Sequence, residues 1–398
     1  MSPRKRKILF LAEGATLAHI GRPLLLAQGL APDQYDVTFA RPASYAWVSA
    51  NASFPIVDLN CQDSAAFARR LELGLPLYEL PTLARYVEDD LDLIDKHHPD
   101  IIVGDFRLSL SVSARLRGVP YITICDAYWS PERPLHPALP VLSFTRFVPI
   151  PLAERVFHAI WPLAQRQHAA PVERLRARYG LPSLGHDLRR CYTDADLRLF
   201  ANIPALFPEL RPSAQAEFIG PIAWSPPDRT DLDVLEGDVP LVYVSMGSSG
   251  DPRVLATLIP VLEQTGARIV VATAGKPLPT SIGSAQTHIF DFLPGNQLCR
   301  RASLVVCNGG SPTTNQALSH GVPVLGIASN MDQFLNMSAI VRQGAGILMR
   351  ADRTQPEKMA VAIAALVNDA RFSTQAQRLA QSGLVKVDLS ASFSRLSK

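Results

Sequence analysis

The sequence predicts an α/β protein of two doubly wound, Rossmann-like domains that face each other across a cleft. Short apolar runs alternate with helix-length periodic segments along most of the chain, as in parallel sheets covered by helices. A polar, proline-containing stretch at 224–238 divides this alternation into two halves and has the composition of a linker. A length of 398 residues with 47% hydrophobic content is sufficient for two sizeable cores.

Composition excludes several classes of protein. The net charge is only +3 and the basic residues cluster only at 4–7, so nucleic acid is not an expected partner. This cluster and the apolar run after it imitate a signal peptide, but the run is too short and Glu13 interrupts it. No stretch has the apolar length of a membrane span, and the five scattered cysteines indicate neither a metal site nor a disulfide framework. We therefore expect a soluble, cytoplasmic enzyme.

The first half, residues 1–223, reads as one domain. Its apolar runs predict strands at 8–12, 35–40, 56–59, 100–105, 121–125, 196–200 and 216–220. Helices are predicted at 24–30, 80–97 and 109–117. In an open parallel sheet, ligands bind where the strands end, so residues that follow these strands are the first candidates for function.

Two such candidates are His19 and Asp105. His19 is predicted in the loop between the first strand and the helix at 24–30, and Asp105 at the end of the strand at 100–105. A carboxylate that meets a histidine at the sheet edge orients the imidazole and raises its basicity. An ordinary surface or capping role is the alternative for His19, and a turn or helix cap is the alternative for Asp105.

The alternating pattern breaks at 133–181, where prolines are dense and aromatic and basic residues alternate between Phe144 and Trp161. Three interpretations remain open: helices and loops that cover a hydrophobic acceptor cleft, a patch that contacts a membrane, or a plain packed helix pair.

The second half, residues 239–375, predicts strands at 240–245, 268–273, 287–292, 302–307 and 322–327 and helices at 313–320 and 356–367. The remaining tail, 376–398, could form a helix that crosses back to the first domain. Gly309 and Gly310 turn the chain between the strand at 302–307 and the helix at 313–320. Glycine-rich turns before helices bind anions through backbone N–H groups and the helix dipole, and nearby hydroxyls would add to such a site.

Several other ligand-binding motifs are absent from the chain or stand in unsuitable places. It has no P-loop, no G-x-G-x-x-G after the first strand and no G-x-S-x-G elbow. D-x-D triplets occur at 90–92, 194–196 and 231–233, but they fall in a helical pattern, at a strand start and in the linker. We therefore predict no metal site.

The stretch 307–337 resembles the donor-binding signature of GT-B nucleotide-sugar glycosyltransferases of the UDP-glycosyltransferase type, including bacterial natural-product enzymes. Counted from Asn308, hydroxyl residues follow five and six positions later, Gly-Val-Pro begins at the thirteenth and Asp332-Gln333 stand where the family has an acidic residue and Gln. The resemblance extends over nearly the whole chain. Two departures concern Asn308, where the family usually has His, and Gln316, where it usually has Glu.

The resemblance implies roles for individual residues. His19 would be the catalytic base, Asp105 would orient it, and the first domain would bind the acceptor. The donor-binding domain would contact the nucleotide sugar through Gly247, Ser248, Leu293, Gln297, Asn308, Gly310, Ser311, Thr313, Thr314, Gln316, Asp332 and Gln333. Of these, Asp332 and Gln333 would bind the sugar hydroxyls.

The implied function is that of an inverting, metal-independent glycosyltransferase. It would move a sugar from a UDP- or dTDP-sugar, which is a co-substrate, to a hydroxyl or similar nucleophile of a small, hydrophobic acceptor, without a cofactor. Two alternatives stay open: a glycosyltransferase for a membrane lipid acceptor, with peripheral membrane contact, and a catalytically impaired homologue that binds nucleotide sugars.

Overall fold

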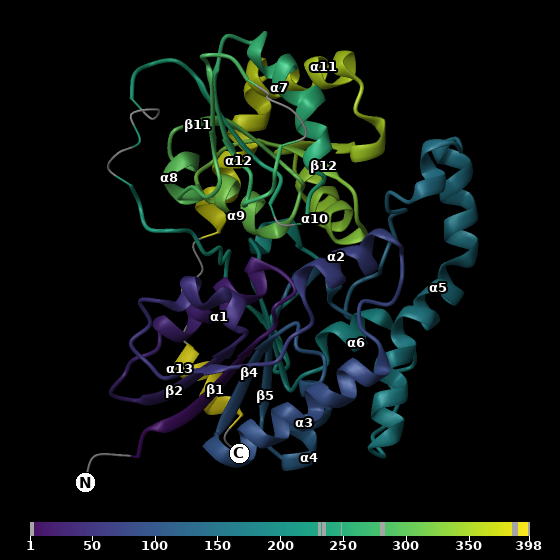
Figure 1. The fold of residues 1–398 in the computed structure, drawn as a ribbon, viewed down its shortest axis with the longest axis vertical. Helices are drawn as coiled ribbons and strands as arrows, with labels where there is room; N and C mark the ends of the chain where they lie inside the picture. The colour runs from purple at the N-terminus through teal and green to yellow at the C-terminus, as the bar shows by residue number, and fades with distance from the viewer. Residues whose placement is uncertain are drawn as a thin grey trace.

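The computed structural model describes residues 4–229, 232, 236–247, 249–278, 283–383 and 389–396. These residues form two sheets with helices packed against them, one sheet in each half of the molecule (Figure 1). Every pairing between the named strands is parallel. The predicted fold class, two doubly wound α/β domains, is confirmed.

The first sheet has seven strands in the order β3-β2-β1-β4-β5-β6-β7. Their bounds are β1 (Arg6–Ala12), β2 (Tyr35–Arg41), β3 (Ile56–Asp58), β4 (Ile101–Asp105), β5 (Tyr121–Cys125), β6 (Leu197–Phe200) and β7 (Ala216–Phe218). The direction of winding reverses between β1 and β4, and such a reversal opens a crevice at the carboxyl ends of the strands. Ala12 lies directly beside Asp105 at this point, so the residues after β1 are brought to Asp105.

The second sheet has six strands in the order β10-β9-β8-β11-β12-β13. Their bounds are β8 (Leu241–Ser245), β9 (Arg268–Ala272), β10 (Thr287–Phe290), β11 (Ala302–Cys307), β12 (Val324–Ala328) and β13 (Gly346–Arg350). Ser245 lies beside Cys307 at the reversal between β8 and β11. The two glycine-containing turns that follow these residues therefore start side by side.

Helices connect the strands of both sheets. In the first domain they are α1 (Leu17–Gln28), α2 (Ser64–Glu72), α3 (Leu80–His97), α4 (Leu110–Arg117), α5 (Ile150–Arg178) and α6 (Leu188–Thr193). In the rest of the chain they are α7 (Leu255–Glu263), α8 (Gly295–Cys299), α9 (Ser311–Ser319), α10 (Met331–Arg342), α11 (Pro356–Asn368), α12 (Ala370–Ser382) and α13 (Leu389–Arg395).

Helix α1 begins earlier than predicted. It starts at Leu17 and continues through Pro23, so His19 lies in its first turn and not in a loop before it. Proline is unfavourable inside a helix, because it lacks an N–H group and crowds the preceding turn, yet Pro23 lies within α1. Here side-chain bonds from His19 and Arg22 to Asp105 hold the turn that precedes Pro23.

The break predicted at 133–181 is largely one helix. Helix α5 spans 29 residues, contains Pro162 and Pro171, and runs along one side of the molecule (Figure 1). The short helix before it, η3 (Ser143–Arg146), is held against the second domain, where Arg353 donates to the carbonyl oxygens of Thr145 and Val148. Among the described helices, α5 included, none has the length and apolar composition needed to cross a bilayer.

The end of the chain packs on the first domain. Phe393 of α13 is fully buried in the core that contains β1 and β2, and its ring meets Tyr35 edge to face at 5.6 Å. Figure 1 shows α13 beside β1 and β2, far from α11 and α12. The chain therefore passes from the second domain back to the first before it ends.

Candidate active site

His19 and Asp105 form a pair at the reversal point of the first sheet. Nδ1 of His19 lies 2.8 Å from Oδ1 of Asp105, which is 1% exposed, whereas the His19 side chain is 16% exposed. An ionised carboxylate can only accept, so Nδ1 carries the proton. No described residue bonds to Nε2, and His19 lines the cleft. Nε2 is therefore free to accept a proton from a molecule in the cleft.

Phe106 supports the imidazole of His19 from one side. The two rings stack with centroids 5.0 Å apart and an angle of 14° between their planes. Phe106 adopts a φ of +59°, a left-handed conformation that costs a non-glycine residue about 1–3 kcal/mol. This conformation lets successive residues, Asp105 and Phe106, both contact His19.

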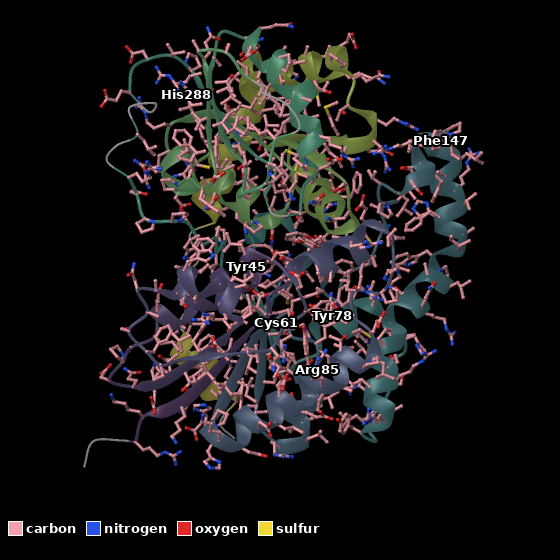
Figure 2. The ribbon with its side chains drawn as sticks, viewed as in Figure 1. Tyr45, Cys61, Tyr78, Arg85, Phe147 and His288 are labelled. Carbon is pink, nitrogen blue, oxygen red and sulfur yellow. The ribbon has the colours of Figure 1, made fainter. Side chains whose placement is uncertain are left out.

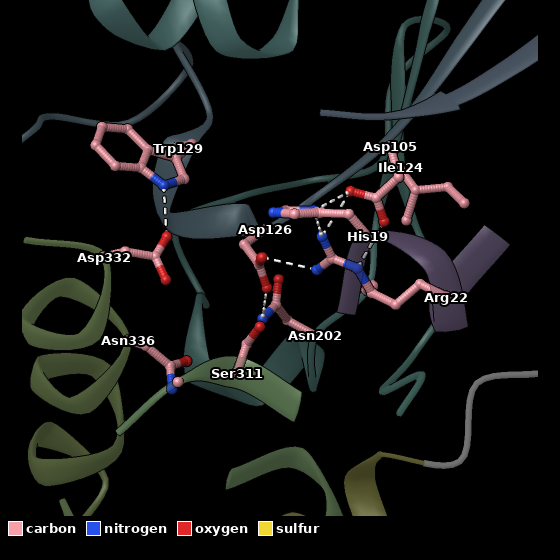
Figure 3. A network of polar contacts seen from close by, with 12 residues as sticks. His19, Arg22, Asp105, Ile124, Asp126, Trp129, Asn202, Ser311, Asp332 and Asn336 are labelled. Atoms are coloured by element: carbon pink, nitrogen blue, oxygen red, sulfur yellow. Dashed lines mark hydrogen bonds and ion pairs between the residues drawn. The ribbon is translucent and has the colours of Figure 1, made fainter. Parts of the chain in front are cut away.

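Arg22 clamps the carboxylate from the other side. Its Nε and one terminal nitrogen both donate to Asp105 at 2.8 Å, and the other terminal nitrogen donates to Asp126 at 2.7 Å (Figure 3). Asp126 in turn accepts from Asn202 at 3.0 Å. Burial alone would raise the pKa of Asp105, but the charges of Arg22 and His19 outweigh burial and lower it. Asp105 is therefore held ionised.

A second buried ion network anchors the segment that follows Asp105. Arg107 is fully buried, and it donates to Asp90 at 3.0 Å and to Glu13 at 3.2 Å. Its guanidinium also lies 3.6 Å from the centre of the Tyr86 ring. Burial raises the pKa of Glu13 despite the neighbouring Arg107. This network fixes the backbone two residues beyond the catalytic candidate.

The roles of Asp126 and Asn202 were not predicted from the sequence, although a signal for them was present. Asp126 directly follows β5 and Asn202 lies two residues beyond β6. The strand-end rule that selected Asp105 applies equally to both. No role was predicted for Arg22 either, although its position three residues after His19, on the same helical face, indicates a shared partner.

The opposite wall of the cleft is built around Asn308. Its side-chain oxygen accepts from the N–H of Gly310 at 3.0 Å, and its nitrogen donates to Ser249 at 3.1 Å. Gly247, which has a φ of +59°, lies close enough that a Cβ there would be 3.5 Å from the same nitrogen. Ser248, a predicted diphosphate contact, lies outside the described residues. The two turns thus meet at Asn308.

Of the hydroxyl residues at the start of α9, some line the cleft and one does not. Ser311 and Thr313 line the cleft together with Gly310. Thr314 is fully buried, does not line the cleft, and donates to the carbonyl oxygen of Gly310 while accepting from Asn336 at 2.8 Å. The structure therefore places Thr314 within the packing of α9, and its contact with a diphosphate stays a prediction.

Asp332 makes a contact across the cleft. The indole N–H of Trp129, in the first domain, donates to Asp332 at 2.9 Å (Figure 3). Burial and the negative charge of Asp126 raise the pKa of Asp332. The next residue, Gln333, accepts from the N–H groups of Ser329 and Asn330 and so closes the first turn of α10. Gln333 lines the cleft, with its oxygen already engaged by the backbone.

Three further donor contacts were predicted at Leu293, Gln297 and Gln316, and the last two bond to the backbone of the linker. Leu293 and Gln316 line the cleft, and Gln316 donates to the carbonyl oxygen of Trp224 at 3.4 Å. Gln297 does not line it. Both ends of its amide are bonded to the backbone of Arg229, at 2.9 and 2.8 Å. The linker thus occupies the amide of Gln297 in this structure, and its contact with the base stays a prediction.

One cleft unites these walls. Its volume is about 690 Å³, and it is lined by His19 and Asp105 from the first domain and by Asn308 and Asp332 from the second. Hydrogen bonds join the domains around it, including one from Asn315 to the carbonyl oxygen of Ala201 at 2.9 Å. The cleft thus brings together a histidine–aspartate pair on the wall of the first domain and a glycine-containing turn before a helix on the wall of the second.

Comparison with known proteins identifies the family. Residues 258–387 match the model "Erythromycin biosynthesis protein CIII-like, C-terminal domain". The chain is 39% identical over 380 residues to the PGL/p-HBAD biosynthesis glycosyltransferase of Mycobacterium tuberculosis (strain ATCC 25177 / H37Ra), which covers 95% of this chain and 89% of that protein. It is 40% identical over 382 residues to the PGL/p-HBAD biosynthesis rhamnosyltransferase of Mycobacterium bovis (strain BCG / Pasteur 1173P2), which covers 96% and 85%. The chain belongs to this family of natural-product-type GT-B glycosyltransferases and is a glycosyltransferase.

A solved structure shows the same fold. The spinosyn rhamnosyltransferase SpnG in complex with thymidine diphosphate aligns with a TM-score of 0.66 at 18% identity, covering 95% of both chains. The predicted resemblance to GT-B glycosyltransferases is therefore confirmed in both sequence and architecture.

Proposed function

We propose that this glycosyltransferase is inverting and metal-independent and moves a sugar from a dTDP- or UDP-sugar to a hydroxyl of a hydrophobic acceptor. The observation that carries the proposal is the cleft, which places the free Nε2 of His19 opposite the wall formed by Asn308 and Asp332. A general base and an anion site on opposite walls of one cleft are suited to a direct displacement at the anomeric carbon.

The proposed chemistry needs one proton transfer. His19 would accept the proton of the acceptor hydroxyl as its oxygen attacks the anomeric carbon from the face opposite the leaving nucleoside diphosphate. Asp105 would stabilise the imidazolium that forms, while Arg22 keeps that carboxylate ionised and in place. Backbone N–H groups at the start of α9 and the side chain of Asn308 would stabilise the charge of the leaving group.

The class of donor is inferred from the wall of the cleft that the second domain forms around Asn308. Ser311, Thr313 and Gly310 line the cleft beside Asn308, where a diphosphate would meet the start of α9. A relative is named as a rhamnosyltransferase, and the SpnG structure holds thymidine diphosphate. These findings favour a rhamnosyl donor on dTDP as the first candidate, with UDP-sugars as the next.

Asp332 is proposed to bind the hydroxyls of the transferred sugar. Asp332→Ala removes a carboxylate that would accept hydrogen bonds from the sugar. From the usual strength of hydrogen bonds to charged groups, we expect kcat/KM for the donor to fall about 10- to 100-fold. Initial rates at varied donor concentration measure this loss. Exposed Asp238, which does not line the cleft, provides the control as Asp238→Ala. Unchanged kcat/KM in Asp332→Ala would remove Asp332 from the sugar site.

The acceptor side of the cleft is strongly apolar. Phe67, Phe106, Phe157, Trp161 and Tyr192 all line it. Pockets of this composition bind apolar ligands and orient them through a few polar groups. The lining supports a hydrophobic acceptor whose reacting hydroxyl lies at His19.

A lipid acceptor at a membrane surface is the second candidate function. Leu152, Val156, Ile160 and Leu163 lie on one face of α5 and are 53%, 53%, 50% and 71% exposed. Val156 and Ile160 also line the cleft, so this apolar row connects the cleft to the surface. Figure 2 shows Phe147, which is 87% exposed, at the outer end of the same segment. Contiguous exposed apolar residues are typical of membrane or partner contacts.

Liposome binding separates the two candidates. If α5 contacts a membrane, the wild type should sediment with anionic liposomes, and a variant with both Phe147→Asp and Leu163→Asp should sediment much less. Neither residue lines the cleft, so transfer to a water-soluble acceptor should persist. Val361→Asp, at an equally exposed apolar position on α11, serves as the control. Equal sedimentation of the double variant and the control would favour a soluble acceptor.

The proposed reaction is tested directly by turnover. The protein is incubated with dTDP-rhamnose or a UDP-sugar and a panel of phenolic and aliphatic alcohols, with and without EDTA. We expect a glycosylated product of inverted anomeric configuration, formed at the same rate in EDTA. Retained configuration would overturn the inverting mechanism, and loss of activity in EDTA that added metal restores would overturn metal independence.

A further inference from the structure

Lys276 lies in the cleft on the side that belongs to the donor. It follows β9 in the loop that precedes β10, and the backbone just before it is left-handed at both Ala274 (φ +56°) and Gly275 (φ +75°). This turn directs the chain toward the cleft, which Ala274 and Lys276 both line. No role was predicted for Lys276 from the sequence.

The ammonium group of Lys276 is close to Asn308. Its Nζ donates to the carbonyl oxygen of Gly250 at 2.9 Å. Gly250 packs against Asn308 so closely that a Cβ on the glycine would lie 3.0 Å from the Cβ of Asn308. Lys276 therefore belongs to the same wall as the two turns that meet at Asn308.

The charge of Lys276 has no counterion in the described part of the chain. The carboxylate with the main electrostatic effect on it, Asp251, is engaged by Arg253, whose Nε and terminal nitrogen both donate to it at 2.8 Å. Burial lowers the pKa of Lys276, because its surroundings disfavour the charged form. A half-buried cation bonded only to a neutral carbonyl oxygen is a costly arrangement unless a ligand supplies the opposite charge.

The charges around the cleft leave Lys276 as the cation available to an anionic donor among the described lining residues. Among the described residues that line the cleft, the lysine and arginine side chains are Arg22 and Lys276, and Arg22 is committed to two carboxylates. Asp291 and Asp332 add further carboxylates to the lining. Asn308, unlike histidine, cannot become positively charged. Without Lys276, a diphosphate would enter a site with no available cation in this part of the chain.

We propose that Lys276 binds the diphosphate of the nucleotide-sugar donor and supplies the positive charge that Asn308 lacks. The inference rests on the proposed function, since it assumes a nucleoside diphosphate donor. In the ligand-free protein the ammonium is held by the carbonyl oxygen of Gly250. On donor binding it would turn to the phosphate oxygens, with which a charge-assisted hydrogen bond is stronger.

The test compares diphosphates with nucleosides. Binding of UDP, dTDP, uridine and thymidine is measured by calorimetry for the wild type, Lys276→Met and Lys276→Arg. Lys276→Met should weaken diphosphate binding about 10- to 100-fold and leave nucleoside binding unchanged. Lys276→Arg keeps the charge and should stay within a few-fold of the wild type. Lys358→Met removes a charge from exposed α11 in the same domain and should have no effect.

Each result has a definite meaning. Unchanged diphosphate binding in Lys276→Met, with a wild type that binds normally, would overturn the role of Lys276 alone. An equal loss of nucleoside and diphosphate binding would also overturn it, because it would show a structural role. A wild type that binds neither UDP nor dTDP would overturn the proposed donor class, and this inference with it.

Discussion

Replacing His19 with alanine should lower the rate of glycosyl transfer about 10²- to 10⁴-fold, the range over which a positioned general base acts. The imidazole is held by Asp105 at Nδ1 and by the ring of Phe106, and its Nε2 faces the cleft. Alanine removes the proton acceptor and leaves the donor wall intact. Single-turnover rates with saturating donor and acceptor measure the chemical step.

The effect of His19→Ala should be confined to chemistry. Binding of dTDP or UDP should stay at the wild-type level, because the proposed nucleotide contacts lie in the other domain. His288→Ala, on β10 and outside the cleft lining, is the matched control (Figure 2). Wild-type transfer by His19→Ala to an ordinary hydroxyl acceptor would show that another group is the base.

The strand-end rule explains how much of the site could be predicted from the sequence. Asp105 and Asn308 each stand at or next to the end of an apolar run, and strands β4 and β11 end where those runs end. The carboxyl ends of parallel strands form the binding edge of a sheet, so the rule places each residue at the binding edge of its own sheet. That the two edges face one cleft depends on how the domains are arranged. Spacing alone then connected Asn308 with Asp332 through the family signature.

The contacts between distant segments could not be predicted in this way. The bond from Trp129 to Asp332 joins residues 203 positions apart and depends on how the two domains close. Helix α5 passes through two prolines that local rules treat as breaks, because tertiary packing of residues such as Phe157 and Leu175 outweighs local preference. Lys276 has no sequence signal, since its role depends on carboxylates and turns from other parts of the fold.

Replacing Arg22 with methionine should destabilise the protein by about 3–5 kcal/mol, the cost of removing one partner from a buried ion pair. Arg22 is 3% exposed and lies between Asp105 and Asp126. Methionine fills part of the volume but leaves both carboxylates without the guanidinium. Urea unfolding followed by circular dichroism measures the change. Arg117→Met breaks a bidentate pair with exposed Asp95 and should shift the midpoint far less, because exposed pairs contribute little.

The pH dependence of this loss distinguishes charge from packing. The pKa of Asp105 is lowered in the folded wild type, so its ionised form adds stability above the unfolded-state pKa of about 3.9 and loses it as the pH falls through the folded-state pKa. In Arg22→Met, the charge of Arg22 no longer opposes the effect of burial on the pKa of Asp105, and His19 is the main remaining group that does. The pKa of Asp105 should therefore rise, and protonation of Asp105 at lower pH should reduce the destabilisation. The stability gap between variant and wild type should therefore be widest near neutral pH and narrow toward about pH 4. A gap that stays constant over this range would show that Arg22 acts through packing alone.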